Sequence, residues 1–262
     1  TNLDYLRQVV ADPLFRDGRQ TTRYLDDFVY RPLTIDVLAA GTQTTVQDYP
    51  GRQGYWDVGV PPSGPMDDLA FRLGNRLLGN DPAAAGLEVT VTGPTLRFNS
   101  DTRICLTGAE MEAALDNRPL PWWQPIAVRA GAVLRLGRLT GGGARAYLAV
   151  QGGIQVPDYL GSKATFTLGR FGGHGGRPLR VGDVLHLRAL PDSPPSGAPL
   201  APELVPAHED HWTLHVIYGP HGAPDFFTDR DMATFFASAW EVHYNSSRTG
   251  VRLIGPKPEW AR

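Results

Sequence analysis

The chain begins with hydrophobic residues at helical spacing. Apolar side chains recur every three or four positions, at Leu3, Leu6, Val10 and Leu14. This spacing places them on one face of a helix, so it predicts an amphipathic helix over residues 3–11. Asp12-Pro13 then breaks the pattern, because proline disfavours helical backbone in the residue before it.

A second helical pattern surrounds Pro65. Proline suits the first position of a helix, and carboxylates such as that of Asp67 favour the positive end of its dipole. The predicted apolar face consists of Met66, Leu69, Ala70, Leu73 and Leu77. Gly79 would close the helix, which we expect over residues 66–79. Asp81-Pro82 predicts a very short helix of alanines after it.

Short strand-like runs fill the chain from Leu87 to Leu190. Turn residues rich in glycine divide them at even spacing. Together with a run at Leu33–Ala39, they are LEVTV, TLRF, RICLTG, MEAAL, IAVRA, AVLRLG, RAYLAV and VLHLRAL. Many short strands with turns between them are typical of a β-barrel or a β-sandwich.

A proline-rich stretch, PDSPPSGAPLAPELVP at Pro191–Pro206, predicts a connector. Beyond it, the run HWTLHVIYG predicts a strand. Thr228 then suits the N-cap of a helix, and EVHYN and GVRLIG predict two further strands. The connector is therefore the best boundary inside the chain.

The segment between residues 43 and 67 reads as an ordered loop. Its sequence, QTTVQDYPGRQGYWDVGVPPSGPMD, is dense in Gly, Pro and Asp but also carries aromatic residues that order a segment. A long ordered loop costs backbone entropy and adds little to a core, so in compact domains such loops usually have a function. We therefore expect a functional site at the Gln43–Asp67 loop.

Composition and charge narrow the classes of function. The 262 residues are 42% hydrophobic and 20% charged, which is typical of a globular protein with one or two cores. A net charge of -2 gives no basic surface for nucleic acid or an anionic membrane. No apolar stretch approaches the roughly 18 residues that span a bilayer. No secretory signal is visible, so the cytoplasm is the expected compartment.

Cysteine and histidine content argue against a metal centre. Cys105 is the single cysteine, which excludes an internal disulfide and a cysteine-rich metal site. Its run, RICLTGA, predicts a buried small side chain. His208, His211 and His215 have spacings that suit a metal ion only on a helix. HWTLHVIYG reads as a strand, where His211 and His215 lie too far apart to bind one ion.

Two glycine clusters could bind anions. RLTGGGAR at residues 138–145 and RFGGHGGR at residues 170–177 place backbone N–H groups beside arginines, although neither fits a phosphate-loop motif. We expect a plain hairpin loop in the first cluster, whereas the second could be a functional loop or a turn. The loop carboxylates Asp48, Asp57 and Asp67 likewise suit turns and caps, or could face a ligand.

The motifs of the loop and of the following strands resemble one known family. QTTVQDYPGRQGYWDVGVPPSGPMD, AFRLGNRLLGN and LEVTVTGPTLRF are similar to the carboxyltransferase domain of biotin-dependent urea carboxylase, or urea amidolyase when an allophanate hydrolase is fused. AYLAVQGGIQVPDYLGSKATFTLGRFGGHGGRPLRVGD and VHYNSSRTGVRLIGPK extend the resemblance. LDYLRQVVADPLFRDGRQTTRYL resembles the end of the biotin carboxylase domain that precedes the carboxyltransferase. The resemblance covers almost the whole chain.

The resemblance implies a mainly β fold, with cyclophilin-like β-barrels in two subdomains and a few short helices. It assigns residues 1–32 to the tail of a biotin carboxylase domain, 33–190 to the first β-barrel region, 191–206 to the connector and 207–262 to a truncated second β region. The chain starts without methionine and stops after a strand-like run, so we expect a fragment. Alone it should be inactive, because the acceptor pocket would need the rest of the second subdomain.

The resemblance also implies a reaction and its cofactors. The family carboxylates biotin with ATP and bicarbonate, then transfers the carboxyl group to urea, which gives allophanate. Close relatives use guanidine. Biotin would sit on a carrier domain outside this chain, and the biotin carboxylase domain would use the ATP and Mg²⁺. The expected partners are therefore these two domains of the same polypeptide, with urea or guanidine as the ligand and no metal ion bound here.

Residue roles follow from the resemblance and from the chemistry of urea. Urea offers one acceptor and four N–H donors, which call for carboxylate, carbonyl and amide partners, and arginine can hold a carboxylate bidentately. We expect Asp67 and Arg248 to be catalytic. The expected substrate-binding residues are Gln47, Asp48, Arg52, Gly64, Met66, Arg170 and Asn245.

Two alternatives remain open. The C-type subunits of 5-oxoprolinase (KipA-like proteins) share the barrel and loop pattern, use no biotin and act with partner subunits in the ATP-dependent opening of 5-oxoproline. The helical segment Leu3–Leu25 argues against this family, since a stand-alone subunit would start near Thr34. The other alternative is a noncatalytic cyclophilin-like binding module, in which nothing in the Gln43–Asp67 loop would converge on a pocket.

Overall fold

The computed structural model of the protein describes residues 2–188, 198–209, 211–244, 246–248 and 250–261. Contacts between residues divide the chain into two units, Thr1–Glu209 and Asp210–Arg262. The first part of the predicted connector at 191–206 lies outside the described residues, and the rest belongs to the first unit. The finer division of the chain expected from the resemblance stays a prediction.

A short helical segment opens the first unit. Helix α1 covers Leu3–Ala11, as predicted, and ends where Asp12 adopts extended backbone. The Asp12 carboxylate then accepts a hydrogen bond from Leu14 N at 2.9 Å and so caps α2, Pro13–Arg16. Helix α3 covers Tyr24–Asp27.

Helix α4 covers Asp68–Leu77. It begins two residues later than predicted, because Asp67 has extended backbone and is the N-cap. The predicted apolar face was partly wrong, since Leu69 is 52% exposed whereas Phe71 is buried. Residues 82 and 83 form a turn in place of the predicted alanine helix.

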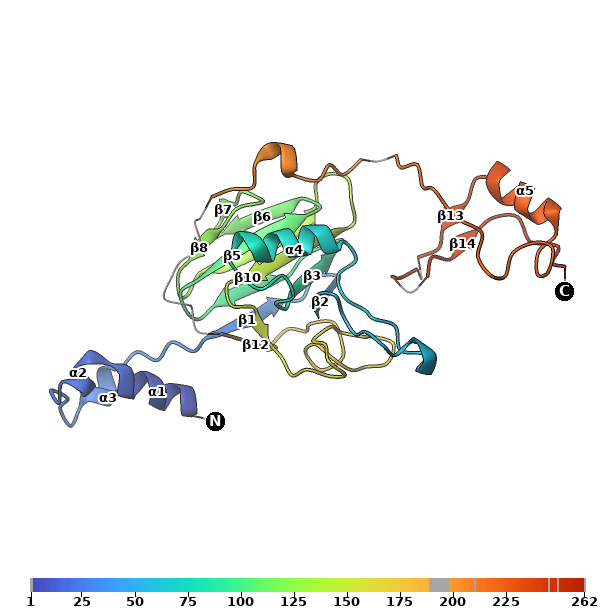
Figure 1. Ribbon diagram of the computed structural model, residues 1–262. Helices are drawn as coiled ribbons and strands as arrows, with labels where there is room; N and C mark the ends of the chain where they lie inside the picture. The colour runs from blue at the N-terminus through green and yellow to red at the C-terminus, as the bar shows by residue number, and fades with distance from the viewer. Residues whose placement is uncertain (1, 189–197, 210, 245, 249, 262) are drawn as a thin grey trace. The chain divides into compact units, whose positions relative to one another are not determined.

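The strands of the first unit form two antiparallel sheets (Figure 1). The seven-stranded sheet has the order β11 (Ile154–Gln155), β12 (Val184–Leu187), β1 (Thr34–Ala39), β4 (Thr95–Phe98), β9 (Val133–Leu139), β6 (Met111–Leu115) and β7 (Arg118–Pro119). The five-stranded sheet has the order β2 (Gln43–Gln47), β3 (Gly86–Thr90), β10 (Arg145–Val150), β5 (Thr102–Gly108) and β8 (Ile126–Val128).

These strands confirm the predicted mainly β fold with few short helices. Each strand-like run named between Leu33 and Leu190 contains a strand in the structure. The described strands of the first unit form two open sheets and do not close into one barrel. Two local predictions were wrong. Gln43–Gln47, interpreted as loop, pairs with β3, and the Gly141–Gly143 loop joins β9 to β10, which are in different sheets, so it is not a hairpin loop.

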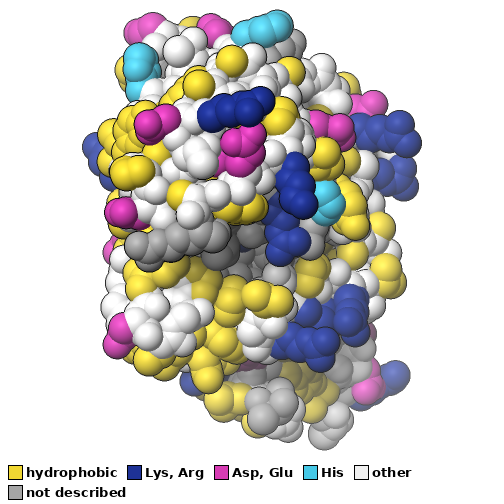
Figure 2. Space-filling view, turned by 90° about the vertical axis from the view of Figure 1, so that its right-hand side faces the viewer, with side chains coloured by type: hydrophobic (Ala, Val, Ile, Leu, Met, Phe, Trp, Pro, Cys, Tyr) yellow, Lys and Arg dark blue, Asp and Glu magenta, His cyan; other side chains and the backbone are white. Residues whose placement is uncertain are grey.

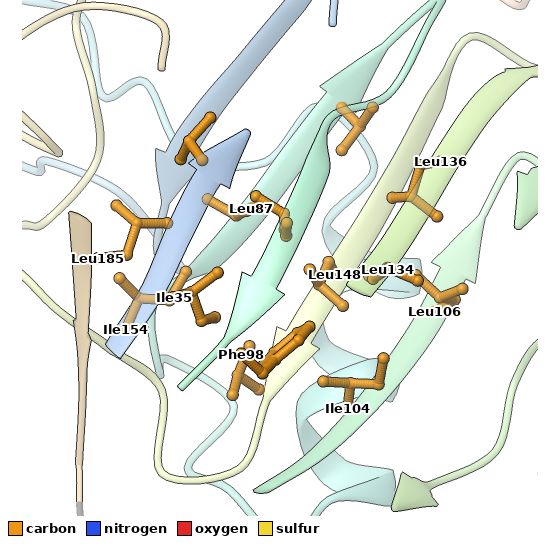
Figure 3. Packing of buried hydrophobic residues seen from close by; sticks show 14 of the residues in the cluster. Ile35, Leu87, Phe98, Ile104, Leu106, Leu134, Leu136, Leu148, Ile154 and Leu185 are labelled. Atoms are coloured by element: carbon orange, nitrogen blue, oxygen red, sulfur yellow. The ribbon is translucent and has the colours of Figure 1, made fainter. Parts of the chain in front are cut away.

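The main hydrophobic core lies between the two sheets. Ile35, Phe98 and Leu134 come from the seven-stranded sheet, and Leu87 and Leu148 from the five-stranded sheet, all fully buried. Figure 3 shows these side chains in the space between the strands. At about 25 cal/mol per Å² of apolar surface removed from water, this burial is the main force that holds the sheets together.

The five-stranded sheet is buried on its other face as well, where α4 packs on β5 and β10 (Figure 1). Along β10, Leu148 joins the main core, whereas Tyr147 packs edge-on against Phe71 of α4, with ring centroids 5.7 Å apart. Successive side chains of a strand point to opposite faces, so neighbours separate in this way. Burial on both faces explains why RAYLAV is apolar nearly throughout.

Cys105 lies in a small buried cluster with Leu78 and Ala149. Burial raises the pKa of its thiol to about 12, so the thiol is protonated at neutral pH. The prediction of a buried small side chain is confirmed, and nothing favours a reactive thiol.

The C-terminal unit contains helix α5, Asp229–Ala237, and the paired strands β13, Glu241–Val242, and β14, Leu253–Ile254. The predicted cap is confirmed. Thr228 Oγ1 accepts a hydrogen bond from Asp231 N at 3.1 Å, and the Asp231 carboxylate accepts one from Thr228 N at 2.9 Å. These reciprocal bonds form a capping box, which fixes the start of α5.

The strand predicted from HWTLHVIYG was wrong, because residues 211–219 form no strand. Their side chains are exposed, with Leu214 at 78% and Ile217 at 93%. A strand needs a pairing partner and a covered face, and the described residues of this unit bury no side chain. Hydrophobic side chains also lie at the surface of the face drawn in Figure 2, among Lys and Arg side chains.

Candidate functional site

Two loops that are far apart in the sequence meet beside β2, and they lie side by side in Figure 1. The Val46 carbonyl accepts hydrogen bonds from Thr165 N at 3.0 Å and from Thr165 Oγ1 at 2.8 Å. These bonds bring the second loop against the end of β2. Residues 47–64 and 159–177 are together called the loop platform below.

Asp48 joins the two loops through both of its carboxylate oxygens. Oδ1 accepts a hydrogen bond from Ser162 Oγ at 2.6 Å, and Oδ2 accepts one from Lys163 N at 2.7 Å. The side chain is buried. Hydrogen bonds to an ionised acceptor are roughly twice as strong as neutral ones, so Asp48 stabilises the platform. Its predicted contact with a substrate stays a prediction.

Arg52 makes a second link and is fully buried. Its Nε donates to the Tyr159 carbonyl at 2.9 Å, its Nη2 donates to the Ala164 carbonyl at 3.0 Å, and its guanidinium lies 4.9 Å from the Phe171 ring centroid. Burial lowers the pKa of Arg52, and the charge of Asp48 opposes this shift. Nη1 is buried with no hydrogen-bond partner among the described residues. The predicted role of Arg52 in binding a substrate carboxylate stays a prediction.

The first loop of the platform folds tightly on itself. Arg52 N donates to the Pro62 carbonyl at 2.6 Å. Gly51 and Gly64 both have positive φ, and a Cβ at Gly51 would lie 2.5 Å from the Pro62 oxygen. A Cβ at Gly64 would lie 3.1 Å from the Pro50 oxygen. Only glycine allows this approach of backbone to backbone, so Gly64 shapes the loop whether or not it contacts a substrate.

Gln47 is fully buried where the platform begins. Its Nε2 donates to Thr45 Oγ1 at 3.0 Å and to the Thr165 carbonyl at 3.4 Å. Its Oε1 is buried and has no hydrogen-bond partner among the described residues. The amide therefore faces the interior of the platform, and its predicted contact with a substrate stays a prediction.

The second glycine cluster forms a compact turn. Positive φ angles occur at Gly172, Gly173, Gly175 and Gly176. A Cβ at Gly176 would overlap the carbonyl group of Arg170, whereas a Cβ at Gly175 would meet nothing closer than 3.9 Å. Arg170 also has positive φ, and its side chain is exposed. Among the platform's predicted site residues, Arg170 is thus a cation that solvent can reach.

An ion pair closes this turn. Arg177 binds Asp183 bidentately, with two N–O distances of 2.8 Å, and Arg180 N donates to the same carboxylate at 2.8 Å. The hydrogen bonds from Arg177 lower the pKa of Asp183 to about 2. His174 Nε2 also lies 3.5 Å from Asp183 Oδ1. Of the three basic residues in this cluster, Arg170, His174 and Arg177, the last two therefore hold the turn together through Asp183.

Asp67 stands at the corner between the loop platform and α4. Its Oδ1 accepts a hydrogen bond from Ala70 N at 3.0 Å, and its backbone N donates to Tyr147 Oη at 2.7 Å. Its Oδ2 lies 3.7 Å from His208 Nε2 and makes no hydrogen bond among the described residues. The side chain is 33% exposed, so part of it is accessible to a ligand.

A buried carboxylate lies beneath this corner. Glu88 Oε2 accepts hydrogen bonds from Met66 N at 2.7 Å and from Tyr147 Oη at 3.1 Å, while Arg145 Nε lies 3.7 Å from Oε1. Burial, with the negative charges of Glu88 and Asp67, raises the pKa of Tyr147, so its hydroxyl stays protonated and donates. The Met66 side chain is half exposed beside Asp67.

Sequence reasoning missed Glu88, Tyr147 and Ser162. LEVTV and RAYLAV were interpreted only as short strands, with no site residues on them. A signal was available, because a carboxylate inside an apolar strand needs buried partners. Ser162 carried no such signal, since its partner Asp48 is 114 residues away.

The C-terminal unit holds the two remaining predicted residues. Arg248 is exposed in the tight connection near the Ser247–Gly250 bridge, between β13 and β14. Asn245 lies outside the described residues. Their roles stay predictions.

Three cavities in the described parts of the chain lie away from the predicted site residues. One of about 650 Å³ belongs to the C-terminal unit and is lined mainly by apolar residues such as Phe227, Phe235 and Trp240. None of the predicted site residues that the structure describes lines it. Within the described parts of the chain, no group of three or more His, Cys, Asp or Glu is placed to hold a metal ion. The same parts contain no helix with the length and apolar character to span a bilayer.

Known proteins are similar to this chain in sequence and in fold. Residues 58–262 match the family described as the carboxyltransferase domain, subdomain A and B. Urea amidolyase of Lachancea kluyveri is 47% identical over 271 aligned residues, which cover 100% of this chain and 15% of that protein. The crystal structure of Kluyveromyces lactis urea carboxylase matches with a TM-score of 0.86 and 46% identity, over 100% of this chain and 24% of that one. The C-type 5-oxoprolinase subunit of Haemophilus influenzae is 35% identical, over 84% of this chain and 68% of that protein.

Substitution of Asp183 tests the ion pair of the glycine-rich turn. A pKa lowered to about 2 in the folded state stabilises the protein above the unfolded value near 3.9, and this stabilisation is lost as the pH falls from about 4 to 2. Asp183→Asn should lower the free energy of unfolding by about 2 kcal/mol at pH 7 and by about half as much at pH 3. Urea unfolding at both pH values measures this. Asp57→Asn, at an exposed loop carboxylate, is the control, and an equal loss at both pH values would contradict the pH dependence.

A matched pair of glycines tests the close packing of the same turn. Gly175 and Gly176 both have a φ of +69°, so alanine costs about 1–2 kcal/mol of backbone strain at either position. Gly176→Ala should cost clearly more, because its Cβ would also overlap the Arg170 backbone. Thermal unfolding of the two variants measures the difference. Equal melting temperatures would show that the turn can open without cost.

Proposed function

We propose a function from one premise, that this chain belongs to the family of carboxyltransferase domains with subdomains A and B. On this premise it forms part of a biotin-dependent urea carboxylase. Its part of the reaction is the transfer of the carboxyl group from carboxybiotin to urea, which gives allophanate, and guanidine is a possible acceptor. The observation that carries the proposal is the match, over the whole chain, to proteins named urea amidolyase and urea carboxylase.

The chain spans 15% of that urea amidolyase and 24% of the urea carboxylase. The proposed reaction therefore needs parts outside this chain. A biotin-carrier domain and a biotin carboxylase domain of the same polypeptide are the proposed partners. ATP and Mg²⁺ would act at the biotin carboxylase domain.

The corner at Asp67 suits the proposed ligands. Urea and the ureido ring of biotin both present N–H donors and one carbonyl oxygen. Asp67 Oδ2 is an acceptor that solvent can reach, Met66 offers an apolar surface beside it, and Arg170 is an exposed donor on the loop platform. Bound biotin would supply the carboxyl group to this site. These three residues would then hold the acceptor and the carboxylate.

Positioning should carry most of the rate enhancement. The nitrogen of urea is a weak nucleophile, so it must be held in line with the carboxyl group, and donors must meet the negative charge that develops. We assign the first task to the Asp67 carboxylate and the second to Arg170. The roles predicted for Arg248 and Asn245 stay separate proposals. Asp48, Arg52 and Gln47 would stabilise the loop platform, because their side chains make hydrogen bonds inside it and at the end of β2.

A second candidate function has support of its own. The match to the C-type 5-oxoprolinase subunit extends over 84% of this chain at 35% identity. A component of an ATP-dependent amide hydrolase would share this fold and need no biotin. We rank it second, because the relatives named for urea are more similar and match the whole chain.

The full-length polypeptide that contains this chain should release ADP in a bicarbonate-dependent reaction, and added urea should accelerate it. Avidin should abolish this reaction, because it binds the biotin that carries the carboxyl group. Coupled measurement of ADP with urea, guanidine or 5-oxoproline as the added substrate tests the assignment. ADP release that depends on 5-oxoproline and resists avidin would instead favour the second candidate.

Asp67→Asn should separate the charge of Asp67 from its role as a helix cap. Asparagine caps a helix about as well as aspartate, so folding should be kept. The kcat for urea carboxylation should fall at least about tenfold, because a hydrogen bond to a charged group contributes about 1.5–3 kcal/mol. Asp68→Asn, one residue further and 54% exposed, is the matched control and should keep kcat within about twofold. An unchanged kcat in Asp67→Asn would remove this carboxylate from the site.

A further inference from the structure

A row of buried polar residues crosses the outer face of the five-stranded sheet. In the register of the sheet, Glu88 of β3 lies opposite Tyr147 of β10, and Tyr147 lies opposite Thr107 of β5. Thr45 of β2 lies opposite Glu88 on the other side. All four are at least 95% buried. Burial of such a row costs free energy unless each polar group has a hydrogen-bond partner. The partners of these four side chains therefore show what the row holds in place.

The row ends on backbone groups of α4 and of the corner before it. Thr107 Oγ1 donates to the Ala70 carbonyl at 2.8 Å. Tyr147 Oη accepts from Asp67 N at 2.7 Å, and Glu88 Oε2 accepts from Met66 N at 2.7 Å. Two successive backbone N–H groups are therefore held by two side chains that also bind each other at 3.1 Å.

We propose that the Tyr147–Glu88 pair is the positioning device for Asp67, and that it fixes the angle at which the Asp67 carboxylate faces the acceptor in carboxyl transfer. This inference rests on the proposed function. Neither side chain touches the substrate. They act through the backbone of residues 66 and 67, just before α4 begins at residue 68. Asp67 accepts hydrogen bonds from Ala70 N and Phe71 N, which tie it to α4, and the pair ties its backbone to the sheet.

The geometry favours positioning over simple packing. The Tyr147 ring already packs on Phe71, so a phenylalanine would fill the same space. What the hydroxyl adds is a hydrogen bond to each side, one received from Asp67 N and one donated to Glu88. The charge of Glu88 strengthens both bonds that its Oε2 accepts. A shift of about 1 Å at a reacting group can cost about a hundredfold in rate, so a clamp on two backbone amides is enough to matter.

Tyr147→Phe in the full-length polypeptide tests the proposal. The kcat of urea carboxylation should fall about tenfold, which corresponds to about 1.4 kcal/mol, while the KM for urea stays within about twofold. Bicarbonate-dependent ATP hydrolysis without urea should be unchanged, because it needs no carboxyl transfer. Tyr30→Phe, which makes the same change in the N-terminal helical segment, is the matched control. A kcat equal to that of the wild type would overturn the proposal.

A double-mutant cycle tests whether the pair acts through Asp67. In the Asp67→Asn background, Tyr147→Phe should lower kcat by much less than tenfold, because the carboxylate that it positions is already gone. Full additivity of the two losses would assign Tyr147 a separate role and overturn the proposal. Glu88→Gln keeps the size and one acceptor oxygen, so it should fold and show a smaller loss of kcat than Tyr147→Phe. Glu110→Gln, at an exposed carboxylate, is its control.

Amide hydrogen exchange separates this inference from the proposed function. In Tyr147→Phe, the Asp67 amide loses its acceptor and should exchange about tenfold faster, whereas amides in the core strands should be unchanged. This readout does not depend on catalysis. Faster exchange in an enzyme that never uses urea would refute the proposed function and keep the structural clamp. Unchanged exchange at Asp67 would refute the clamp, whatever the substrate.

Discussion

Burial of the five-stranded sheet on both faces is the constraint on which the rest of the structure depends. Each strand must supply one face to the main core and the other to the surface under α4, and the period of two along the strand decides which residue goes where. Leu148 and Tyr147 are neighbours in sequence, yet one stabilises the sandwich and the other reaches the corner at Asp67. The residues that support the proposed site thus lie on strands of the five-stranded sheet, on the face that is turned away from the main core.

The sequence predicted the elements well where a local pattern governs them. The first helix, the capped helix after Thr228 and the runs of short strands all follow from periodicity and capping chemistry. The start of α4 was misplaced for a local reason, because Asp67 is the N-cap and not part of the first turn. Other predictions failed where tertiary contacts decide. HWTLHVIYG forms no strand because the described residues offer it no partner. The Gln43–Gln47 run is a strand because β3 pairs with it, which its own composition did not reveal.

The same distinction divides the candidate site. The loop between residues 43 and 67 could be recognised as important from its length and composition. The sequence does not reveal which of its polar groups face inward, because their hydrogen-bond partners lie far along the chain. Asp48 and Arg52 look like ligand-binding groups in the sequence, and in the structure they bind the second loop. Asp67 and Arg170, which the sequence grouped with them, are the ones that solvent can reach.

The links made by Asp48 and Arg52 also set an order of events during synthesis. Their partners lie more than a hundred residues downstream, at separations of 112 residues for Arg52 and Ala164 and 114 for Asp48 and Ser162. At about 5–20 residues per second, the first loop waits on the order of 10 s for the second to leave the ribosome. During that time Arg52 and Asp48, which are buried in the folded protein, lack these partners and remain exposed to solvent. The loop platform therefore forms late, after most strands of the first unit have left the ribosome, and only β12 among those strands follows it.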